Sequence, residues 1–223
     1  MQIKAILLDI DGTLVDSNDL HVLAWEAAFA EIGVTFDRKT IHDQIGKGTV
    51  MLVPTLLPDI DDAGETALGE AHGRIFKEKY LAEARPFAGA HDLIAHAHGL
   101  GQRVVLASSA SGAELEHYLD LLDATDLVAE TTSGDDVEQT KPAPDIFATA
   151  LKKLSGIGAD AVIVVGDTPY DITAAQKCGI AAVAVRSGGF PDDALRAAGA
   201  IALYDDVAAL LADYAASPLG GEQ

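Results

Sequence analysis

Two carboxylates two residues apart, Asp9 and Asp11, end an apolar run near the N-terminus and precede Gly12. Alternate residues of a strand share a face, so both side chains can point toward one centre. Carboxylates at that spacing repel each other unless a cation lies between them or one is protonated. Gly12 permits a tight turn whose N–H groups can hold an anion. The pattern favours a joint cation and anion site, although an aspartate in a turn or at a helix start gives the same residues.

Three later segments also place polar residues where apolar strands end. One strand ends in the hydroxyl of Ser108, and another ends in Asp167, with Asp171 one helical turn later. Lys141 precedes a proline near a helix start, and such a residue is extended, which leaves its side chain free to reach back to the strand ends. Ligands of open α/β sheets bind at the carboxyl ends of the strands, so these residues should meet beside Asp9.

The four segments, in this order along the chain, resemble the four motifs of the haloacid dehalogenase superfamily in its phosphatase branch, which opens with Asp-x-Asp-Gly-Thr. The likeness runs over essentially the whole chain. It implies a Mg²⁺-dependent phosphatase that hydrolyses a small phosphorylated metabolite through an aspartyl-phosphate intermediate. Phosphoglycolate or a sugar phosphate is the substrate that the resemblance favours.

The resemblance gives the first two acids distinct roles. Asp9 is the expected nucleophile, which attacks phosphorus and splits hydrolysis into two displacements. Asp11 is the expected general acid and base, which protonates the leaving alkoxide and then deprotonates the attacking water. Relatives that cleave carbon–halogen bonds lack an acid at this position, so Asp11 favours phosphoryl transfer.

The same resemblance implies a magnesium ion held by the side chains of Asp9 and Asp167 and by the backbone carbonyl of Asp11. Mg²⁺ keeps several waters and binds few carboxylates, which suits so sparse a site. Asp171 is expected to support the metal waters and the lysine without binding the ion directly.

Four residues are expected to bind the transferring phosphate. Ser108 and Lys141 match the hydroxyl and the lysine of the family, and the backbone N–H groups of Ser109 and Gly12 are further donors. Lys141 would screen the charge on the nucleophile and on the phosphoryl group. The alternative for Lys141 is an ordinary surface lysine. Because a cation near a helix N-terminus is electrostatically unfavourable, the position favours a functional role for Lys141.

Short apolar strands alternate with helical stretches over most of the chain and predict a doubly wound, Rossmann-like α/β core around a parallel sheet. The strands are expected at 3–9, 103–108, 127–131, 161–166, 181–185 and 200–204, and the helices at 112–122, 145–154, 170–178 and 192–198.

The region from about residue 16 to 85 breaks this alternation, because it contains helical patterns without a convincing strand. Helices are expected at 18–32, 39–45, 49–57 and 62–84. The region resembles the helical cap of the subfamily that includes phosphoglycolate phosphatase and β-phosphoglucomutase. We therefore expect a core of residues 1–15 and 86–223, a cap of residues 16–85, and hinges near 15–17 and 85–87.

The cap should supply specificity, because the core residues contact only phosphate and metal. Lys47 lies between two glycines and could contact a substrate carboxylate or hydroxyl, and His21 would face the site if its helix begins at Asn18. An ordinary surface position is an equal alternative for both.

The composition of the chain argues against some classes of binding partner and favours one cellular compartment. The formal net charge of −20 argues against nucleic-acid and anionic-membrane surfaces. No apolar run is long enough to span a membrane, and the N-terminus lacks a signal-peptide pattern. Cys178 is the only cysteine, which excludes an intramolecular disulfide and fits a reducing cytoplasm. The chain is expected to be a monomer or homodimer, with a frayed tail from Ser217 onward.

Two other functions remain open on the sequence. A phosphomutase of the β-phosphoglucomutase type would share the acids and the magnesium but protect the aspartyl-phosphate from water. A non-catalytic binding module would keep the fold without the chemistry. The presence of every motif residue makes the binding module a remote alternative.

Overall fold

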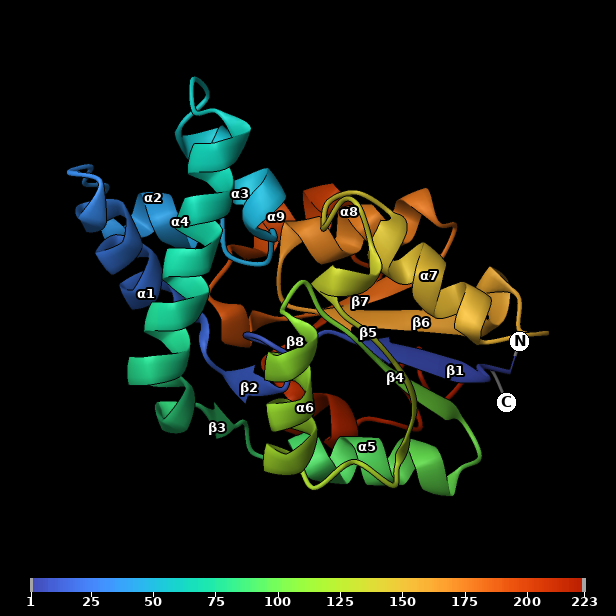
Figure 1. Ribbon diagram of the computed structural model, residues 1–223. Coiled ribbons are helices and arrows are strands. Elements are labelled where there is room, and N and C mark those ends of the chain that lie inside the picture. The colour runs from blue at the N-terminus through green and yellow to red at the C-terminus, as the bar shows by residue number, and fades with distance from the viewer. Residues whose placement is uncertain (1, 222–223) are drawn as a thin grey trace.

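The computed structural model describes residues 2–221 and is built around a six-stranded parallel sheet (Figure 1). The strand order is β5-β4-β1-β6-β7-β8, so the first strand lies in the interior, and the strand order reverses on either side of it. The strands are β1 (Ala5–Leu8), β4 (Arg103–Ala107), β5 (Val128–Thr132), β6 (Val162–Gly166), β7 (Ala181–Val185) and β8 (Ala202–Tyr204).

Alternate residues of the strands pack into two separate apolar clusters, one on each face of the sheet. In β1, Ile6 and Leu8 join one cluster, whereas Ala5 and Leu7 join the other. Helices cover both faces, which explains why these strands are apolar throughout. One face packs against α5 (Ala90–Gly99), α6 (Gly112–Leu121) and α10 (Val207–Ala212), and the other against α7 (Asp145–Lys153), α8 (Pro169–Lys177) and α9 (Asp192–Ala198).

A helical insert follows the first strand and stands beside the sheet (Figure 1). Its entry and exit form a small antiparallel pair, in which Val15 pairs with Pro86 and Asp16 with Arg85. The insert has its own apolar cluster, whose buried members run from Val22 to Phe76 and include Trp25. Its elements are β2 (Val15–Asp16), α1 (Asn18–Glu31), α2 (Arg38–His42), α3 (Thr49–Leu56), α4 (Asp62–Ile75), a π-helical turn (Phe76–Tyr80), a 3-10 turn (Leu81–Glu83) and β3 (Arg85–Pro86).

The observed elements lie close to those expected, with two informative differences. The helix expected at 62–84 remains helical as far as Glu83, but its α-helical hydrogen bonding ends at Ile75. The expectation of a frayed tail from Ser217 is wrong for the described residues. The Leu219 side chain is fully buried in the core, and its carbonyl accepts a hydrogen bond from Gln102 at 2.9 Å. Residues 222 and 223 lie outside the described chain.

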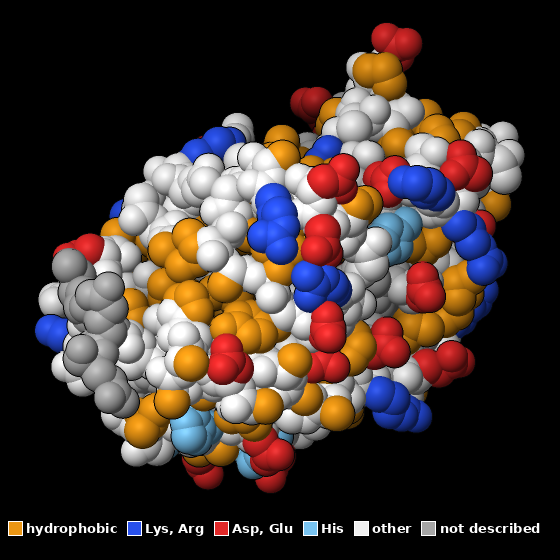
Figure 2. Space-filling view, turned by 180° about the vertical axis from the view of Figure 1, so that it is seen from behind, with side chains coloured by type: hydrophobic (Ala, Val, Ile, Leu, Met, Phe, Trp, Pro, Cys, Tyr) orange, Lys and Arg blue, Asp and Glu red, His pale blue; other side chains and the backbone are white. Residues whose placement is uncertain are grey.

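The surface is mixed in charge despite the net negative charge. On the face shown in Figure 2, lysine and arginine side chains lie among acidic ones. Arg186 illustrates this pattern, because it forms ion pairs with both Asp192 and Asp205. Within residues 2–221 no helix is long and apolar enough to cross a membrane.

Candidate active site

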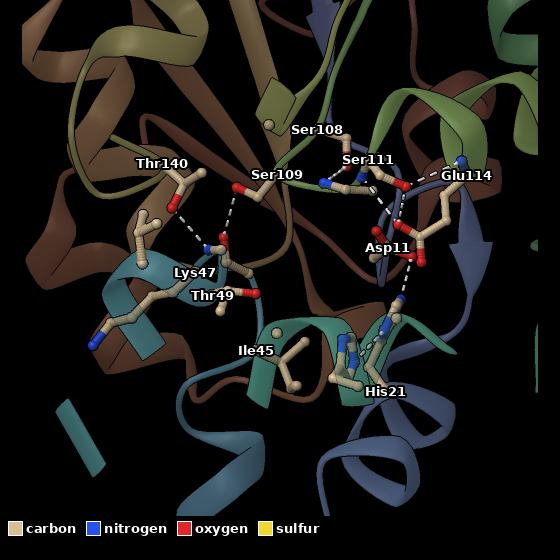
Figure 3. Close-up of a pocket in the computed structure, with 18 of the residues that line it drawn as sticks. Asp11, His21, Ile45, Lys47, Thr49, Ser108, Ser109, Ser111, Glu114 and Thr140 are labelled. Carbon is tan, nitrogen blue, oxygen red and sulfur yellow. Dashed lines mark hydrogen bonds and ion pairs between the residues drawn. The ribbon is translucent and has the colours of Figure 1, made fainter. Parts of the chain in front are cut away.

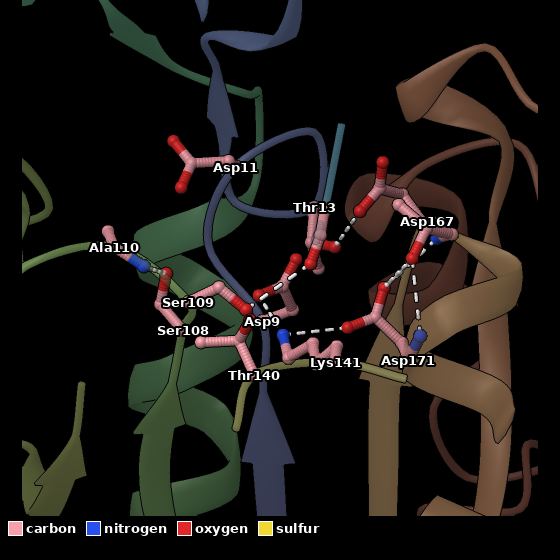
Figure 4. Close-up of polar contacts among 12 residues, drawn as sticks. Asp9, Asp11, Thr13, Ser108, Ser109, Ala110, Thr140, Lys141, Asp167 and Asp171 are labelled. Carbon is pink, nitrogen blue, oxygen red and sulfur yellow. Dashed lines mark hydrogen bonds and ion pairs between the residues drawn. The ribbon is translucent and has the colours of Figure 1, made fainter. Parts of the chain in front are cut away.

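Lys141 is fully buried between two of the predicted site acids. Its ammonium forms ion pairs with Asp9, at the end of β1, and with Asp171, in the first turn of α8, where the Nζ to Oδ1 distance is 2.7 Å (Figure 4). Burial alone would lower the pKa of Lys141, but the two carboxylates raise it, so the lysine stays charged. The sheet thus brings together residues that lie more than 130 positions apart in the sequence.

Asp167 completes a cluster of three buried acids with Asp9 and Asp171. One carboxylate oxygen from each lies within 4.8 Å of the others. Burial, followed by repulsion from neighbouring acids, raises the pKa of Asp9 to about 7 and that of Asp167 well above its usual value. One lysine cannot neutralise three buried carboxylates, so the cluster fits a divalent cation.

Hydrogen bonds and ion pairs hold the two acids of the cluster that follow β6 in position. Asp171 uses Oδ2 to accept hydrogen bonds from the backbone and hydroxyl of Thr168, in the capping box of α8, and Oδ1 to pair with the lysine. Asp167 accepts from the Thr13 hydroxyl and from the Asn18 amide, each at 3.0 Å. These contacts fix the Asp167 side chain, one oxygen of which lies within 4.8 Å of an oxygen of Asp9.

Asp11 and Asp9 line one cavity between core and insert, but the Asp11 carboxylate points away from Asp9, Asp167 and Asp171 (Figure 4). Its Oδ1 accepts hydrogen bonds from Ser17 at 2.6 Å, Tyr118 at 2.9 Å and His21 at 3.1 Å. Burial alone would raise the pKa of Asp11, but the charge of His21 and these hydrogen bonds lower it to about 2. Asp11 is therefore an ionised carboxylate in this position.

His21 connects Asp11 to a group of stacked rings in the insert. Its ring lies 3.8 Å from that of Phe76, and its Nδ1 lies 3.3 Å from Nε2 of His72, which in turn stacks on Trp25 at 4.2 Å. Burial alone would lower the pKa of His21, but Asp11 raises it. A protonated His21 donates to Asp11 and to His72, which requires an unprotonated Nε2 on His72.

The expected phosphate-binding residues surround the end of β1, but one expectation is wrong. Ser108 is buried and accepts a hydrogen bond from the Ala110 backbone, while the Ser109 hydroxyl donates to the Gly46 carbonyl at 3.2 Å. The N–H of Gly12 is not free to bind an anion, because it donates to the Val15 carbonyl at 2.8 Å.

Gly12 is instead required because the backbone at this position passes close to the side chains of Asp167 and Asn18. Its φ is +76°, and a Cβ there would lie 2.3 Å from both Asp167 Oδ2 and Asn18 Nδ2. The turn after Asp11 therefore closes on the acid cluster, and only glycine leaves space for it.

A loop of the insert docks on the ends of several core strands. Besides the bond to Ser109, the Gly48 N–H donates to the Thr140 hydroxyl at 3.0 Å, and His42 Nε2 donates to the Gly188 carbonyl at 3.0 Å. Tyr170 also donates a hydrogen bond to the Asp43 carbonyl. The acid cluster consequently lies beneath a cavity enclosed between insert and core.

The cavity is about 310 Å³ in volume, and Asp9 is among the residues that line it. Figure 3 shows further lining residues from the core and the insert. His21 and Lys47 both line it, but their charged groups differ in direction. His21 points to Asp11, whereas the Lys47 ammonium extends away from it, donates to Gln44 at 2.6 Å, and lies 4.8 Å from the centre of the Tyr170 ring.

Several residues of the site carried no usable signal in the sequence. Asn18 and Tyr118 belong to helical segments, and nothing in their spacing connects them to a distant acid. The Asp-x-Asp-Gly-Thr pattern does contain Thr13, and this is the one case where the sequence pointed at the residue without giving its role.

Comparisons with known proteins agree with this geometry. Residues 6–185 match the family model of haloacid dehalogenase-like hydrolases. The phosphoglycolate phosphatase of Rhodospirillum rubrum is 30% identical over 216 residues, which cover 93% of this chain and 89% of that protein.

Solved structures show the same likeness. A hydrolase from Pseudomonas syringae superposes with a TM-score of 0.89 and 29% identity, covering 96% of this chain and 98% of that one. CbbY from Rhodobacter sphaeroides in complex with xylulose-(1,5)bisphosphate gives a TM-score of 0.77 and 26% identity, with 94% and 96% covered. The chain therefore belongs to the haloacid dehalogenase-like hydrolases, in the helical-cap subfamily that is similar to phosphoglycolate phosphatase and β-phosphoglucomutase, and is a phosphatase of that type.

Proposed function

We infer that the protein is a Mg²⁺-dependent phosphatase that hydrolyses a small phosphorylated metabolite through an aspartyl-phosphate on Asp9. The observation that supports this most directly is the buried cluster of Asp9, Asp167 and Asp171, in which Lys141 pairs with Asp9 and Asp171. Such a cluster needs a cation, and it lies at the base of a cavity large enough for a small phosphate ester.

In the proposed reaction, Asp9 and Asp167 hold the ion, and the Asp11 backbone carbonyl is the remaining protein ligand. The bound Mg²⁺ neutralises charge on the carboxylate and the phosphoryl group, so that one anion can attack another. Lys141 supplies a second positive charge beside the nucleophile, and Asp171 holds that lysine in position.

The Ser108 hydroxyl and the Ser109 N–H are the proposed phosphate ligands beside Asp9. Ser108 is buried at the end of β4, which is the neighbour of β1 in the sheet, so its hydroxyl lies on the correct edge. The Ser109 side chain is engaged with the insert, which leaves its backbone N–H as the proposed phosphate donor.

The acid–base role proposed for Asp11 requires a change of side-chain position. Its Oδ1 is bound by Ser17, His21 and Tyr118, and the carboxylate points away from Asp9. Rotation about the side-chain bonds of Asp11 would bring it toward the leaving oxygen, and protonated His21 is the adjacent source of the proton it must carry.

We propose the division into core and cap at residues 15–16 and 85–86. The separate apolar cluster of the insert and the two-stranded pair at its base support this division. Movement of the cap about that pair would admit substrate and then exclude bulk water. The docking of the insert loop on Thr140 and Tyr170 corresponds to the closed arrangement.

The test is phosphate release from a panel of phosphate esters in Mg²⁺, with p-nitrophenyl phosphate as a general probe. The names of relatives place phosphoglycolate and xylulose bisphosphate in that panel. We expect turnover that EDTA abolishes and Mg²⁺ restores, and that Asp9→Asn reduces by at least about a thousandfold. Turnover unaffected by Asp9→Asn would overturn the proposal. Isomerisation of β-glucose 1-phosphate without net phosphate release would identify a phosphomutase instead.

A further inference from the structure

Several carboxylates besides Asp9 line the cavity. Asp11 and Glu114 line it, together with Asp135, and Figure 3 shows Asp11 and Glu114 on the same side as His21. Since Asp9 holds the phosphoryl group at the base, the rest of the substrate extends into the space between these side chains and the insert.

The described residues that line the cavity direct no unpaired cationic group toward a substrate. Among the described residues that line the cavity, Lys47 is the only lysine or arginine, and its ammonium is directed to Gln44 and the Tyr170 ring. His21 is the other cationic group, and its charge is paired with Asp11. A second anionic group on the substrate would meet negative charge without a partner, which is costly in a partly buried cavity.

The cavity is well supplied with groups that recognise hydroxyls. Thr49 and Ser111 add side-chain hydroxyls, and Glu114 adds a carboxylate. Glu114 uses Oε2 to accept hydrogen bonds from the Ser111 N–H and hydroxyl, and within the described chain its Oε1 accepts none. A free carboxylate oxygen accepts a hydrogen bond from a hydroxyl or from an ammonium group.

The position of Glu114 in α6 decides between these two donors. Glu114 is the third residue of the helix and part of its capping box, so the helix N-terminus stabilises the ionised carboxylate without a bound cation. The carboxylate keeps its net negative charge toward the cavity, and its free oxygen still accepts a hydrogen bond. The geometry therefore favours an uncharged hydroxyl over an ammonium group.

We propose that the substrate is a phosphate monoester whose leaving group is uncharged and bears hydroxyls, such as a polyol or sugar monophosphate, and that Glu114 excludes leaving groups with a carboxylate or a second phosphate. This inference rests on the proposed phosphatase function. It separates the present chain from relatives named phosphoglycolate phosphatase, because the leaving group of phosphoglycolate carries a carboxylate.

Three phosphate esters of nearly equal size test the proposal. The leaving groups of 2-hydroxyethyl phosphate, phosphoglycolate and phosphoethanolamine end in a hydroxyl, a carboxylate and an ammonium group, respectively. Glycerol 3-phosphate and 3-phosphoglycerate form a larger pair that differs in the same way. We expect kcat/KM in Mg²⁺ to be at least about tenfold higher for each hydroxyl ester than for its carboxylate partner.

The variant Glu114→Gln removes the charge and keeps a side chain that can serve in the capping box. It should raise kcat/KM for the carboxylate esters by about fivefold, and so narrow the ratio between each hydroxyl ester and its carboxylate partner by at least that factor. The matched control is Glu116→Gln, an exposed acid of the same helix outside the cavity lining, which should change neither ratio.

The outcomes separate this inference from the function on which it rests. Equal or higher kcat/KM for the carboxylate esters, or a preference for phosphoethanolamine, would overturn the inference while leaving the phosphatase intact. An effect of Glu114→Gln on these kcat/KM ratios no larger than that of Glu116→Gln would show that Glu114 does not determine the preference. Failure of every ester, p-nitrophenyl phosphate included, would refute the proposed function and this inference with it.

Discussion

Asn18, the first residue of α1, donates a hydrogen bond from its amide to Asp167 Oδ2 at 3.0 Å, although 149 positions separate the two residues. The same amide lies 3.4 Å from the Gly188 carbonyl, which fixes the orientation of the Asn18 side chain. The first helix of the insert therefore holds an acid at the end of a core strand, and this connects the position of the insert to the proposed metal site.

Replacing Asn18 should weaken metal binding more than folding. In Asn18→Ala, Asp167 loses one of its two side-chain donors, so we expect the Mg²⁺ concentration for half-maximal activity to rise by about tenfold. A Mg²⁺ titration of phosphate release measures this. The control is Asp19→Ala, an exposed neighbour on the same helix, which should leave the titration unchanged. Superimposable titrations for Asn18→Ala and wild type would show that this hydrogen bond does not orient Asp167.

Two glycines with nearly the same φ allow backbone strain to be separated from steric conflict. Gly33, with φ +73°, has open space around an added Cβ, whereas Gly12, with φ +76°, does not. We expect Gly33→Ala to cost about 1 kcal/mol of unfolding free energy from strain alone. Gly12→Ala should cost about 3 kcal/mol or more, because its Cβ meets Asp167 and Asn18 as well. Urea denaturation measures both, and equal losses would show that the site relaxes around the methyl group.

Lys141 neutralises part of the negative charge of the buried cluster formed by Asp9, Asp167 and Asp171. In Lys141→Met, Asp9 and Asp171 lose their shared partner, so we expect a loss of about 3–5 kcal/mol of stability and of nearly all activity. Because the variant has more uncompensated negative charge, added Mg²⁺ should raise its Tm more than that of the wild type. Thermal unfolding with and without Mg²⁺ tests this. The prediction is wrong if Mg²⁺ shifts the two proteins equally.

His72 gives the insert a pH-dependent contribution to stability. Burial, followed by repulsion from the charge of His21, holds the pKa of His72 well below its usual value, so it is neutral in the folded protein. Unfolding lets it take up a proton below about pH 6.5, so its contribution is complete above that pH and is lost as the pH falls toward the folded-state value.

We therefore expect the unfolding free energy of the wild type, relative to His72→Gln, to fall by about 1 kcal/mol between pH 7.5 and pH 5.5. Glutamine keeps an acceptor for His21 but does not titrate in this range. Urea denaturation of both proteins at several pH values provides the measurement. Parallel profiles would mean that His72 takes up its proton in the folded state.

The sequence alone determined the framework of the fold. The continuous apolar strands and the intervening helical stretches predicted the parallel sheet, because strands buried on both faces leave an unbroken apolar run. The acids at the ends of β1 and β6 could be placed together from topology, since the carboxyl ends of parallel strands share one edge of a sheet.

The directions of side chains and the use of backbone donors required the tertiary structure. The turn after Asp11 was expected to leave the Gly12 N–H free, but hydrogen bonding to the Val15 carbonyl occupies it. Lys47 lines the cavity, but its ammonium donates a hydrogen bond to Gln44 and lies over the Tyr170 ring. The position of Lys47 in the sequence does not predict either contact.

The sequence by itself determined which residues could do the chemistry, because Asp9, Lys141 and Asp167 lie at strand and helix ends that local patterns identify. Only the tertiary structure decided how Asp11 and Glu114 face the cavity. Their surroundings come from β1, the insert and α6 at once, and contacts between distant segments depend on how those elements pack rather than on any local pattern.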